Sequence, residues 1–317
     1  YDTRTLLRNS VNTVSCDNNG TTWLGYYQTG ISYYNRENFK FGINKMEQVR
    51  TVNQSFEADV NQIVEDIHGN IWIGTNGSGI LRIDKKTGQQ KIFKHDENNP
   101  KSLPSDVIVH MIATPDGKIW IGTFLGGLTY FDGESFHNFA NNNDIPYPLK
   151  ATSVWSLALD ESNRLWVGTL NRGIASIDFN NDNKVDVYSK ELNLTLSDYI
   201  SCIQPSRNGG VFAGTEKGLM HIDPLKHTCR QVDQAGLYPI LHEIINVLLE
   251  DSRGILWVGT RNGLCALDPS RHTIKIFNVK NGLTNDYISA LIEDLNHNIW
   301  VTTSNGLTNI VVSNNPN

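Results

Sequence analysis

Apolar positions along the chain follow a pattern that recurs seven times. Each copy is centred on an aromatic anchor, as in the phrase Ile-Trp-Ile-Gly-Thr at 71–75 and again at 119–123. Apolar residues stand nine and twelve positions before every anchor, as Ile63 and Val60 do before Trp72. The anchors are Trp23, Trp72, Trp120, Trp166, Phe212, Trp257 and Trp300. They are spaced 49, 48, 46, 46, 45 and 43 residues apart. A period of this length is the sequence signature of a repeat architecture.

A tight turn is predicted just before each anchor. Most copies have Asp six positions and Gly three positions before the anchor, as Asp66 and Gly69 are placed before Trp72. The Asp side chain can accept hydrogen bonds from local N–H groups, while Gly tolerates positive φ. Asn163 and His297 replace this Gly in two copies, and both residue types tolerate the left-handed region.

Two more short strands follow each anchor. A run such as Ile80–Asp84 ends in Asp, and a last alternating segment such as Lys91–Lys94 completes the unit. Four short antiparallel strands in about 45 residues, with no helical period, are typical of propeller blades, which close radially and leave little sheet edge exposed. We therefore predict an all-β fold, a single seven-bladed β-propeller of four-stranded antiparallel blades over residues 1–317.

The last copy predicts an unusual closure. It ends at Leu307–Val312 and lacks a fourth strand, and only Tyr1–Leu6 remains at the other terminus to supply one. We expect the seventh blade either to be clasped partly by residues 1–6 or to have three strands.

The anchors are interpreted as structural. A Trp on the second strand fills the wedge between twisted neighbouring blades, and the Gly two residues later leaves room where strands crowd. The glycine cluster Gly74–Gly79 superficially suggests a phosphate loop, but it opens a strand instead of a helix, so the anion-binding rationale is absent.

Charge and cysteine content narrow the function classes. The 317 residues carry 27 Lys and Arg against 33 Asp and Glu, with a net charge of −6 and no basic block, so nucleic acid is not favoured as a partner. No apolar run is long enough to span a bilayer and no signal peptide opens the chain, so any export signal must lie outside it. The four cysteines are Cys16, Cys202, Cys229 and Cys265. We interpret them as buried and unpaired, although Cys229 and Cys265 can also meet across neighbouring units.

Signals for catalysis and metal binding are weak. The segment 178–186 spaces oxygens as a calcium loop does, but Asn183 replaces the glycine and Ser189 replaces the final glutamate, so a plain turn is favoured. No zinc-protease, nucleophile-elbow or Walker sequence occurs. Paired carboxylates from distant blades remain open for glycoside hydrolysis. We nominate no catalytic residue, no metal ligand and no cofactor.

Candidate ligand-binding residues lie in the loops between second and third strands. These loops share one face with the connections between blades, and they are one residue longer in copies one to four than in copies five to seven. Flat aromatic rings beside charged groups suit the stacking of a sugar ring and the recognition of its hydroxyls. The candidates are Tyr26, Tyr27, Phe124, Arg172, Glu216, Lys217 and Arg261.

Two further groups carry less weight. Aromatic and imidazole side chains lie in the connections between blades, at Tyr147, Tyr199, Tyr238, His242 and Tyr287. Residues on the innermost strands that can reach the central channel are His110, Trp155 and Asn246. Six of the seven tryptophans are anchors, so Trp155 is the tryptophan that the repeat does not explain.

The repeat resembles a known family. The unit Asp-x-x-Gly-x-Ile-Trp-Ile-Gly-Thr-x-x-Gly-Leu-x-x-x-Asp is similar to the two-component regulator propeller repeat, and the resemblance covers essentially the whole chain. That repeat builds the periplasmic sensor region of hybrid two-component systems, best known in gut Bacteroidetes, where they govern polysaccharide-utilisation genes. The resemblance implies a periplasmic location, as part of a protein anchored in the inner membrane.

The resemblance also implies partners. Relatives carry two consecutive propellers, an immunoglobulin-like domain, one membrane span, a histidine kinase, receiver domains and a helix-turn-helix output. The chain is then one non-enzymatic propeller of such a sensor, with an oligosaccharide ligand, the neighbouring propeller and immunoglobulin-like domains, and a second copy in a homodimer as expected partners. Two alternatives stay open: a structural propeller whose neighbour does the sensing, and a propeller enzyme, either a lyase or a glycosidase.

Overall fold

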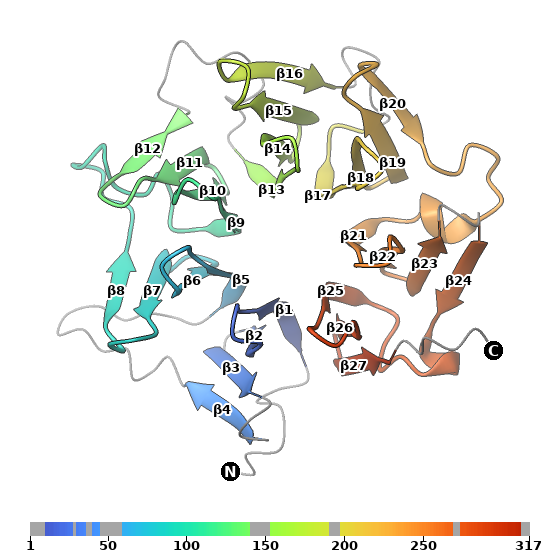
Figure 1. The fold of residues 1–317 in the computed structure, drawn as a ribbon, viewed down its shortest axis with the longest axis horizontal. Coiled ribbons are helices and arrows are strands. Elements are labelled where there is room, and N and C mark those ends of the chain that lie inside the picture. Colours follow the sequence, from blue (N-terminus) through green and yellow to red (C-terminus); the bar gives the residue numbers. More distant parts are fainter. Residues whose placement is uncertain are drawn as a thin grey trace.

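Seven antiparallel sheets stand in a ring around a central axis (Figure 1). The computed structural model describes residues 10–27, 30–35, 40–44, 59–139, 153–189, 197–268 and 273–311. Within these residues six sheets have four strands, and the last sheet has three. The predicted seven-bladed β-propeller is therefore confirmed.

Each blade uses its strands in chain order from the axis outward (Figure 1). The innermost strands are β1 (Val11–Cys16), β5 (Val60–Glu65), β9 (Ile108–Ala113), β13 (Val154–Leu159), β17 (Ile200–Pro205), β21 (Ile245–Glu250) and β25 (Ile288–Glu293). The second strands are β2 (Thr22–Tyr26), β6 (Asn70–Thr75), β10 (Ile119–Thr123), β14 (Arg164–Thr169), β18 (Val211–Thr215), β22 (Leu256–Thr260) and β26 (Ile299–Thr303).

The outer half of each blade completes the sheet. The third strands are β3 (Gly30–Asn35), β7 (Ile80–Asp84), β11 (Gly127–Phe131), β15 (Ile174–Asp178), β19 (Gly218–Asp223), β23 (Leu264–Asp268) and β27 (Gly306–Ile310). The fourth strands are β4 (Lys40–Asn44), β8 (Gln90–Phe93), β12 (Phe136–Asn138), β16 (Lys184–Tyr188), β20 (Thr228–Gln231) and β24 (Thr273–Phe277). The short 3₁₀ turns η3 (Pro239–His242) and η4 (Val279–Asn281) lie in connections between blades.

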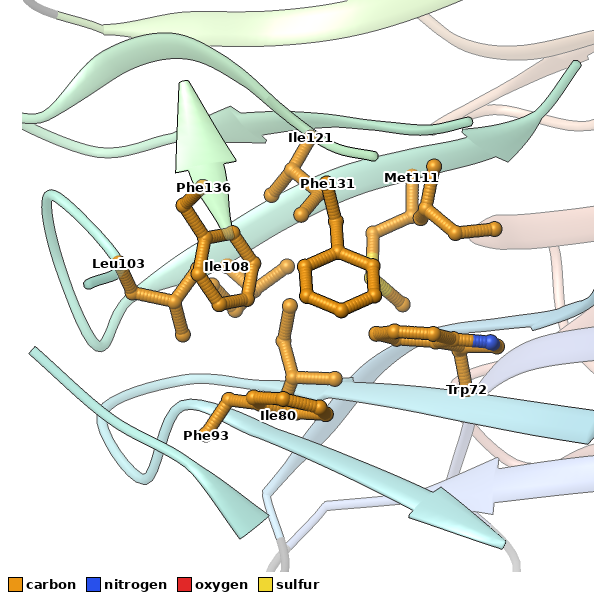
Figure 2. Close-up of a cluster of buried hydrophobic side chains, with 10 residues drawn as sticks. Trp72, Ile80, Phe93, Leu103, Ile108, Met111, Ile121, Phe131 and Phe136 are labelled. Atoms are coloured by element: carbon orange, nitrogen blue, oxygen red, sulfur yellow. The ribbon is translucent and has the colours of Figure 1, made fainter. Parts of the chain in front are cut away.

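Every anchor lies on a second strand, and those of the first six blades pack toward the following blade. The ring of Trp72 lies 5.3 Å from that of Phe131 in the next blade, within a cluster of buried apolar side chains (Figure 2). A Cβ on Gly74, two residues after this anchor, would lie 2.6 Å from Ile108, so glycine lets the neighbouring innermost strand approach. The predicted roles of anchor and glycine are both confirmed.

The predicted turns are confirmed, and they contain a bond that was not predicted. Asp66 accepts backbone N–H groups from His68 and Asn70, at 2.9 and 2.8 Å, and its other oxygen accepts the indole Nε1–H of Trp72 at 2.8 Å. Burial alone would raise the pKa of this carboxyl, but the donors outweigh burial and hold the pKa below its usual range. The same Asp–indole bond joins Asp17 to Trp23, Asp160 to Trp166, Asp251 to Trp257 and Asp294 to Trp300.

The two residues that replace the turn glycine adopt the predicted conformation. Asn163 has φ of 58° and His297 has φ of 62°.

Two blades lack the Asp–indole bond. In blade three, Thr114 stands at the Asp position, and the Nε1 of the anchor Trp120 is buried without a hydrogen-bond partner among the described residues. In blade five, Ser206 replaces the Asp and Phe212 replaces the Trp.

Blade seven meets blade one through β25 and β1 (Figure 1). The Ser289 hydroxyl donates to the Val11 carbonyl at 2.8 Å across this junction. Thr302 replaces the usual glycine here, and its hydroxyl lies 2.8 Å from that of Ser289. The described part of blade seven has three strands, and the clasp expected from residues 1–6 lies outside the described residues.

Candidate functional site

The innermost strand of every blade has a β-bulge at its second residue. In blade one, for example, the register shifts between Val11 and Thr13, so Asn12 is the extra residue. Bulges re-aim side chains and are common at barrel rims and beside active sites. We call the seven bulged residues the bulge ring: Asn12, Asn61, Val109, Trp155, Ser201, Asn246 and Ser289.

Five members of the bulge ring connect neighbouring blades. The Asn61 amide donates to the carbonyl of Ile108, the first residue of the next innermost strand, at 2.8 Å. Asn246 donates to Ile288 in the same way at 2.9 Å. Equivalent bonds join Asn12 to Val60, Ser201 to Ile245 and Ser289 to Val11. A small polar residue at this position is therefore part of the scaffold.

Val109 and Trp155 interrupt this pattern. Val109 has no side-chain donor, and the large indole of Trp155 replaces the short amide or hydroxyl of the other blades. Trp155 is half-buried and contacts two other aromatic rings. Its ring centroid lies 6.5 Å from Phe124 at 81°, and 6.2 Å from Tyr199 at 52°. We call Phe124, Trp155 and Tyr199 the aromatic arc, and it extends over blades three, four and five.

The arc lies on the face that was predicted to carry the ligand. Phe124 begins the loop from β10 to β11, and its N–H donates to the carbonyl of Val107, just before β9, at 3.0 Å. The loop between second and third strands therefore contacts the connection that enters the blade. Tyr199 occupies the corresponding connection immediately before β17. We call this side of the ring the upper face.

Charged groups surround the Tyr199 end of the arc. Burial is the main cause that raises the pKa of the Tyr199 hydroxyl, with Cys202 and Glu216 adding to the shift and Arg261 opposing it. The Ser197 hydroxyl donates to a Glu216 carboxylate oxygen at 3.3 Å. Of the predicted residues, Phe124 contacts Trp155, which the sequence ranked lower. Glu216 and Arg261 act electrostatically on Tyr199, the other residue that the sequence ranked lower.

The other four predicted residues have different placements. Tyr27 is 48% exposed, and Arg172 and Lys217 are exposed loop residues. Tyr26 is fully buried, and its hydroxyl lies 2.7 Å from that of Ser32. The expectation that Tyr26 offers its ring to a ligand is wrong, since the ring packs in the core of blade one.

The repeat register explains this error. Tyr26 occupies the position three residues after the anchor, where other blades have a buried threonine. Thr169 and Thr260, at this position, donate their hydroxyls to the glycine carbonyls that close the loop, four and three residues later. These bonds also confirm the longer loop in blade four and the shorter one in blade six. Alignment of Tyr26 with these threonines would have excluded it.

Apart from Trp155 and Tyr199, the described residues of the two groups that carried less weight in the sequence mostly have structural contacts. Asn246 belongs to the bulge ring, while His242 contacts Asp233 at 3.3 Å and Gln231 at 2.7 Å. Burial lowers the pKa of His110 to about 4, and its Nδ1 is enclosed without a partner. Tyr287 is 41% exposed, Tyr238 lines a cavity described below, and Tyr147 lies outside the described residues.

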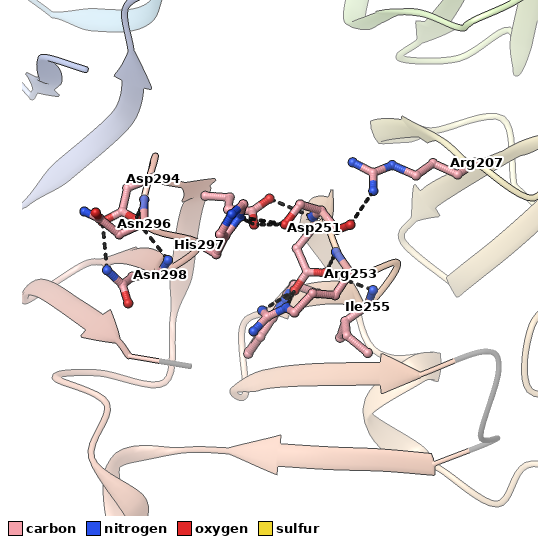
Figure 3. A network of polar contacts seen from close by, with 11 residues as sticks. Arg207, Asp251, Arg253, Ile255, Asp294, Asn296, His297 and Asn298 are labelled. Atoms are coloured by element: carbon pink, nitrogen blue, oxygen red, sulfur yellow. Dashed lines mark hydrogen bonds and ion pairs between the residues drawn. The ribbon is translucent and has the colours of Figure 1, made fainter. Parts of the chain in front are cut away.

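Carboxylates on the opposite, lower face connect blades through backbone N–H groups. Glu250 accepts the N–H of Arg207 at 3.0 Å, and Glu293 accepts that of Ser252 at 2.7 Å. Figure 3 shows these turns, with Arg253 also paired to Asp251. The described lower-face carboxylates in this network are already hydrogen-bonded, so they serve the scaffold.

Metal and disulfide chemistry have little support. No cluster of His, Cys, Asp or Glu in the described ranges has an arrangement that would hold a metal ion, and all four cysteines are free thiols. The segment 178–186 runs from the end of β15 through the turn into β16, and Arg164 pairs with Asp178 at 2.9 Å and Asp186 at 3.3 Å. Among the described residues, no helix has the length and apolar character needed to cross a membrane.

Solved structures share this fold. The extracellular domain of a hybrid two-component system from B. thetaiotaomicron matches with a TM-score of 0.80 and 21% identity, over 97% of this chain and 40% of that chain. A one-component system domain from the same organism matches at 0.74 and 20%, over 97% and 39%. The chain spans about two fifths of the length of these proteins. Virginiamycin B lyase from Staphylococcus aureus matches at 0.70 and 15%, over 96% of both chains.

Sequence comparison is more restricted. No curated protein matches this chain by sequence. The family described as "Two component regulator propeller" matches residues 55–77, 102–124, 148–171 and 239–262, each of which includes the first two strands of a blade. The resemblance noted from the sequence is therefore confirmed. The chain is a seven-bladed β-propeller, and four of its segments match the two-component regulator propeller family.

Proposed function

We propose that this propeller is a periplasmic, non-enzymatic ligand-binding module of a hybrid two-component signalling protein. The matched repeats and the similarity to extracellular domains of such systems support this assignment. In this proposal the kinase and the membrane anchor belong to other parts of a longer protein. The neighbouring propeller and immunoglobulin-like domains, and a second copy, are its expected protein partners.

The ligand in this proposal is an oligosaccharide released by polysaccharide breakdown. The observation that carries it is the aromatic arc, where Trp155 replaces a scaffold residue of the bulge ring and contacts Phe124 and Tyr199. Half-buried aromatic rings provide a stacking surface for the apolar face of a sugar. Glu216 and Arg261 supply charged hydrogen-bonding groups beside it, and Tyr27, Arg172 and Lys217 extend the polar rim of the upper face.

The enzyme alternative makes a different prediction. A lyase or glycosidase needs titratable groups with shifted pKa values that converge in one pocket. Among the described carboxyls, the lowered pKa values of Asp17, Asp66, Asp251 and Asp294 belong to separate turns where each side chain already accepts an indole N–H. Burial raises the pKa of Glu250, but this carboxylate already accepts the N–H of Arg207 in the lower-face network. This distribution favours a binding module over an enzyme.

Titration calorimetry against a panel of plant and host oligosaccharides tests the proposal. We expect at least one member to bind the propeller, and Phe124→Ala and Tyr199→Ala each to weaken that binding about tenfold or more, since a stacked ring contributes on the order of 1 kcal/mol or more. Lys184→Gln, an exposed change on β16, is the matched control. Binding only by a longer sensor region, with none by this propeller, would favour the structural alternative.

A further inference from the structure

The junction between blades two and three is filled by aromatic rings. We call it seam 2/3, and its ring centroids lie 5.0–5.5 Å apart in the pairs Trp72–Phe93, Trp72–Phe131, Phe93–Phe136 and Phe131–Phe136 (Figure 2). Two cationic side chains of this seam, Arg82 and Lys91, also lie over its aromatic rings. The guanidinium of Arg82 lies 5.7 Å from the Trp72 ring, and the Lys91 ammonium lies 4.8 Å from the Phe93 ring.

The junction between blades five and six, seam 5/6, has the same backbone register but smaller side chains. Strand pairing places Phe212 at the position of Trp72, and Leu267 and Ile274 at those of Phe131 and Phe136. Val232 pairs with Leu219 as Phe93 pairs with Ile80, so it replaces that phenylalanine. All four aromatic positions of seam 2/3 are therefore reduced in size.

These reductions coincide with a cavity. A space of about 460 Å³ lies along seam 5/6, and Phe212, Val232, Leu267 and Ile274 all line it. Ser206 also lines it, at the position where five other blades place the aspartate that binds the anchor indole. A volume of this size falls within the range of small-molecule sites, and its walls come from two blades.

The side chain of one cation at this cavity has no hydrogen-bond or ion-pair partner among the described residues. Arg230 lines the cavity and is exposed, and its guanidinium forms no hydrogen bond or ion pair with the residues that the structure describes. It occupies the place of Lys91 in seam 2/3, but Val232 has replaced the ring on which that lysine stacks. His221 lies between Phe212 and Arg230 in the same row, with ring centroids 5.0 Å apart for Phe212 and His221.

Two of the other polar side chains that line the cavity, His221 and Asp233, are hydrogen-bonded to the backbone. The His221 Nε2 lies 3.2 Å from the Gly209 carbonyl, and Asp233 accepts the N–H groups of Leu237 and Tyr238 at 3.1 and 2.6 Å. The apolar and aromatic side chains of Phe212, Val232, Leu267 and Ile274 form one part of the wall. The Asp233 carboxylate is occupied by the two N–H groups and by His242 at 3.3 Å, so the guanidinium of Arg230 is the cation available to a ligand. An anion with a flat apolar body complements this combination.

We propose that seam 5/6 is a binding site for a small aromatic carboxylate. The ring of the ligand occupies the volume that indole and phenyl groups fill in seam 2/3, and its carboxylate receives hydrogen bonds from Arg230. This site is separate from the aromatic arc on the upper face and from the oligosaccharide proposed there.

Naphthalene-2-carboxylate is a suitable probe, and the neutral naphthalene-2-carboxamide is its matched control. We expect the carboxylate to bind the 317-residue propeller by calorimetry. The carboxamide should bind at least about tenfold more weakly, because a hydrogen-bonded pair between charged groups is lost. Arg230→Gln should cause a similar loss, while Lys184→Gln, in the neighbouring blade, should leave the affinity unchanged.

A second variant fills the cavity. Ser206→Asp combined with Phe212→Trp rebuilds the anchor pair of the other blades, and we expect it to abolish carboxylate binding with a melting temperature at or above that of the parent. Should the double variant fail to fold, the exposed Arg230→Gln decides alone. The proposal is overturned if the parent does not bind at millimolar probe, if the carboxamide binds equally well, or if Arg230→Gln leaves the affinity unchanged.

Discussion

Blades one, two, six and seven differ from blades three, four and five in two bonds. The first group keeps both the Asp–indole bond and the bulge-ring bond to the next blade, as Asp66 and Asn61 show in blade two. Each blade of the second group lacks at least one. Blade three lacks both bonds, because Thr114 replaces the Asp and Val109 replaces the bulge-ring donor. Blade four lacks the bulge-ring bond at Trp155, and blade five lacks the Asp–indole bond at Phe212.

The interruptions are consecutive, and both proposed sites adjoin them. The aromatic arc extends over blades three to five, and the cavity of seam 5/6 lies beside Phe212. In a repeat fold each unit contacts mainly its neighbours, so a unit can lose a scaffold bond while the others still hold the ring. The comparison therefore teaches that the repeat supplies the frame and that departures from it supply the surfaces for binding.

The largest expected effect comes from truncating an anchor. Trp72→Ala should lower the free energy of unfolding by about 3–5 kcal/mol, since it empties a packed aromatic cluster and removes the indole donor of Asp66. Phe212→Ala should cost at least about 1 kcal/mol less, because Phe212 borders an existing cavity and has no Asp partner. Denaturant unfolding measures both, and equal losses would contradict the distinction between the blade groups.

The Asp–indole bond predicts a pH dependence. Asp66→Asn should lower stability by about 1–2 kcal/mol at neutral pH, because the hydrogen bonds then end on an uncharged group. The pKa of Asp66 is lower in the folded protein, so its contribution is present above the unfolded pKa of about 3.9 and is lost as pH falls through the folded pKa. The difference between parent and variant, followed by urea unfolding, should shrink below about pH 4. A constant difference would refute this origin.

Restoring the missing acceptor in blade three should stabilise the ring. Thr114→Asp offers a carboxylate to the buried Nε1 of Trp120, which has no partner, and should add about 1 kcal/mol to the free energy of unfolding. Ser206→Asp is the control, because Phe212 has no N–H to donate. Thermal unfolding compares the stability of the two variants with that of the parent. If both variants gained equally, the gain would come from the added charge and not from the bond to Trp120.

The smallest effect is expected in the bulge ring. Val109→Asn should regain the bond to the next blade that Asn61 makes, with a gain of about 0.5–1 kcal/mol, and Asn61→Val should lose a similar amount. The two variants form a matched pair in adjacent blades, and guanidinium unfolding distinguishes them. Opposite signs are predicted, and a loss in both would show that the bond is not what stabilises this position.

Much of the frame was predictable because the repeat is local. Anchors, turns and loop lengths follow from spacing alone, and even the left-handed Asn163 and His297 were expected from their alignment with glycine. Tyr26 was misjudged although the same alignment placed it with buried threonines. Tyr26 is the last residue of β2, so its position in the repeat places the ring in the core and not in the loop.

The sites were less predictable because they depend on neighbouring blades. Trp155 stood out as a tryptophan without an anchor role, but its contact with Phe124 and Tyr199 requires the bulge and the packing of three blades. The cavity of seam 5/6 results from four reductions spread over residues 212–274. Each reduction is an ordinary apolar substitution, so no single position signals the site.

Trp155→Asn tests the central claim that binding occurs where the repeat is interrupted. This change installs the residue that Asn61 and Asn246 provide elsewhere, so the variant should fold and gain the bond to the Ile200 carbonyl. Calorimetry with the oligosaccharide panel should then show binding to the parent and at least about a tenfold loss in the variant, since stacking on the indole is removed. Undiminished binding by a well-folded Trp155→Asn, or no binding by the parent, would contradict the account.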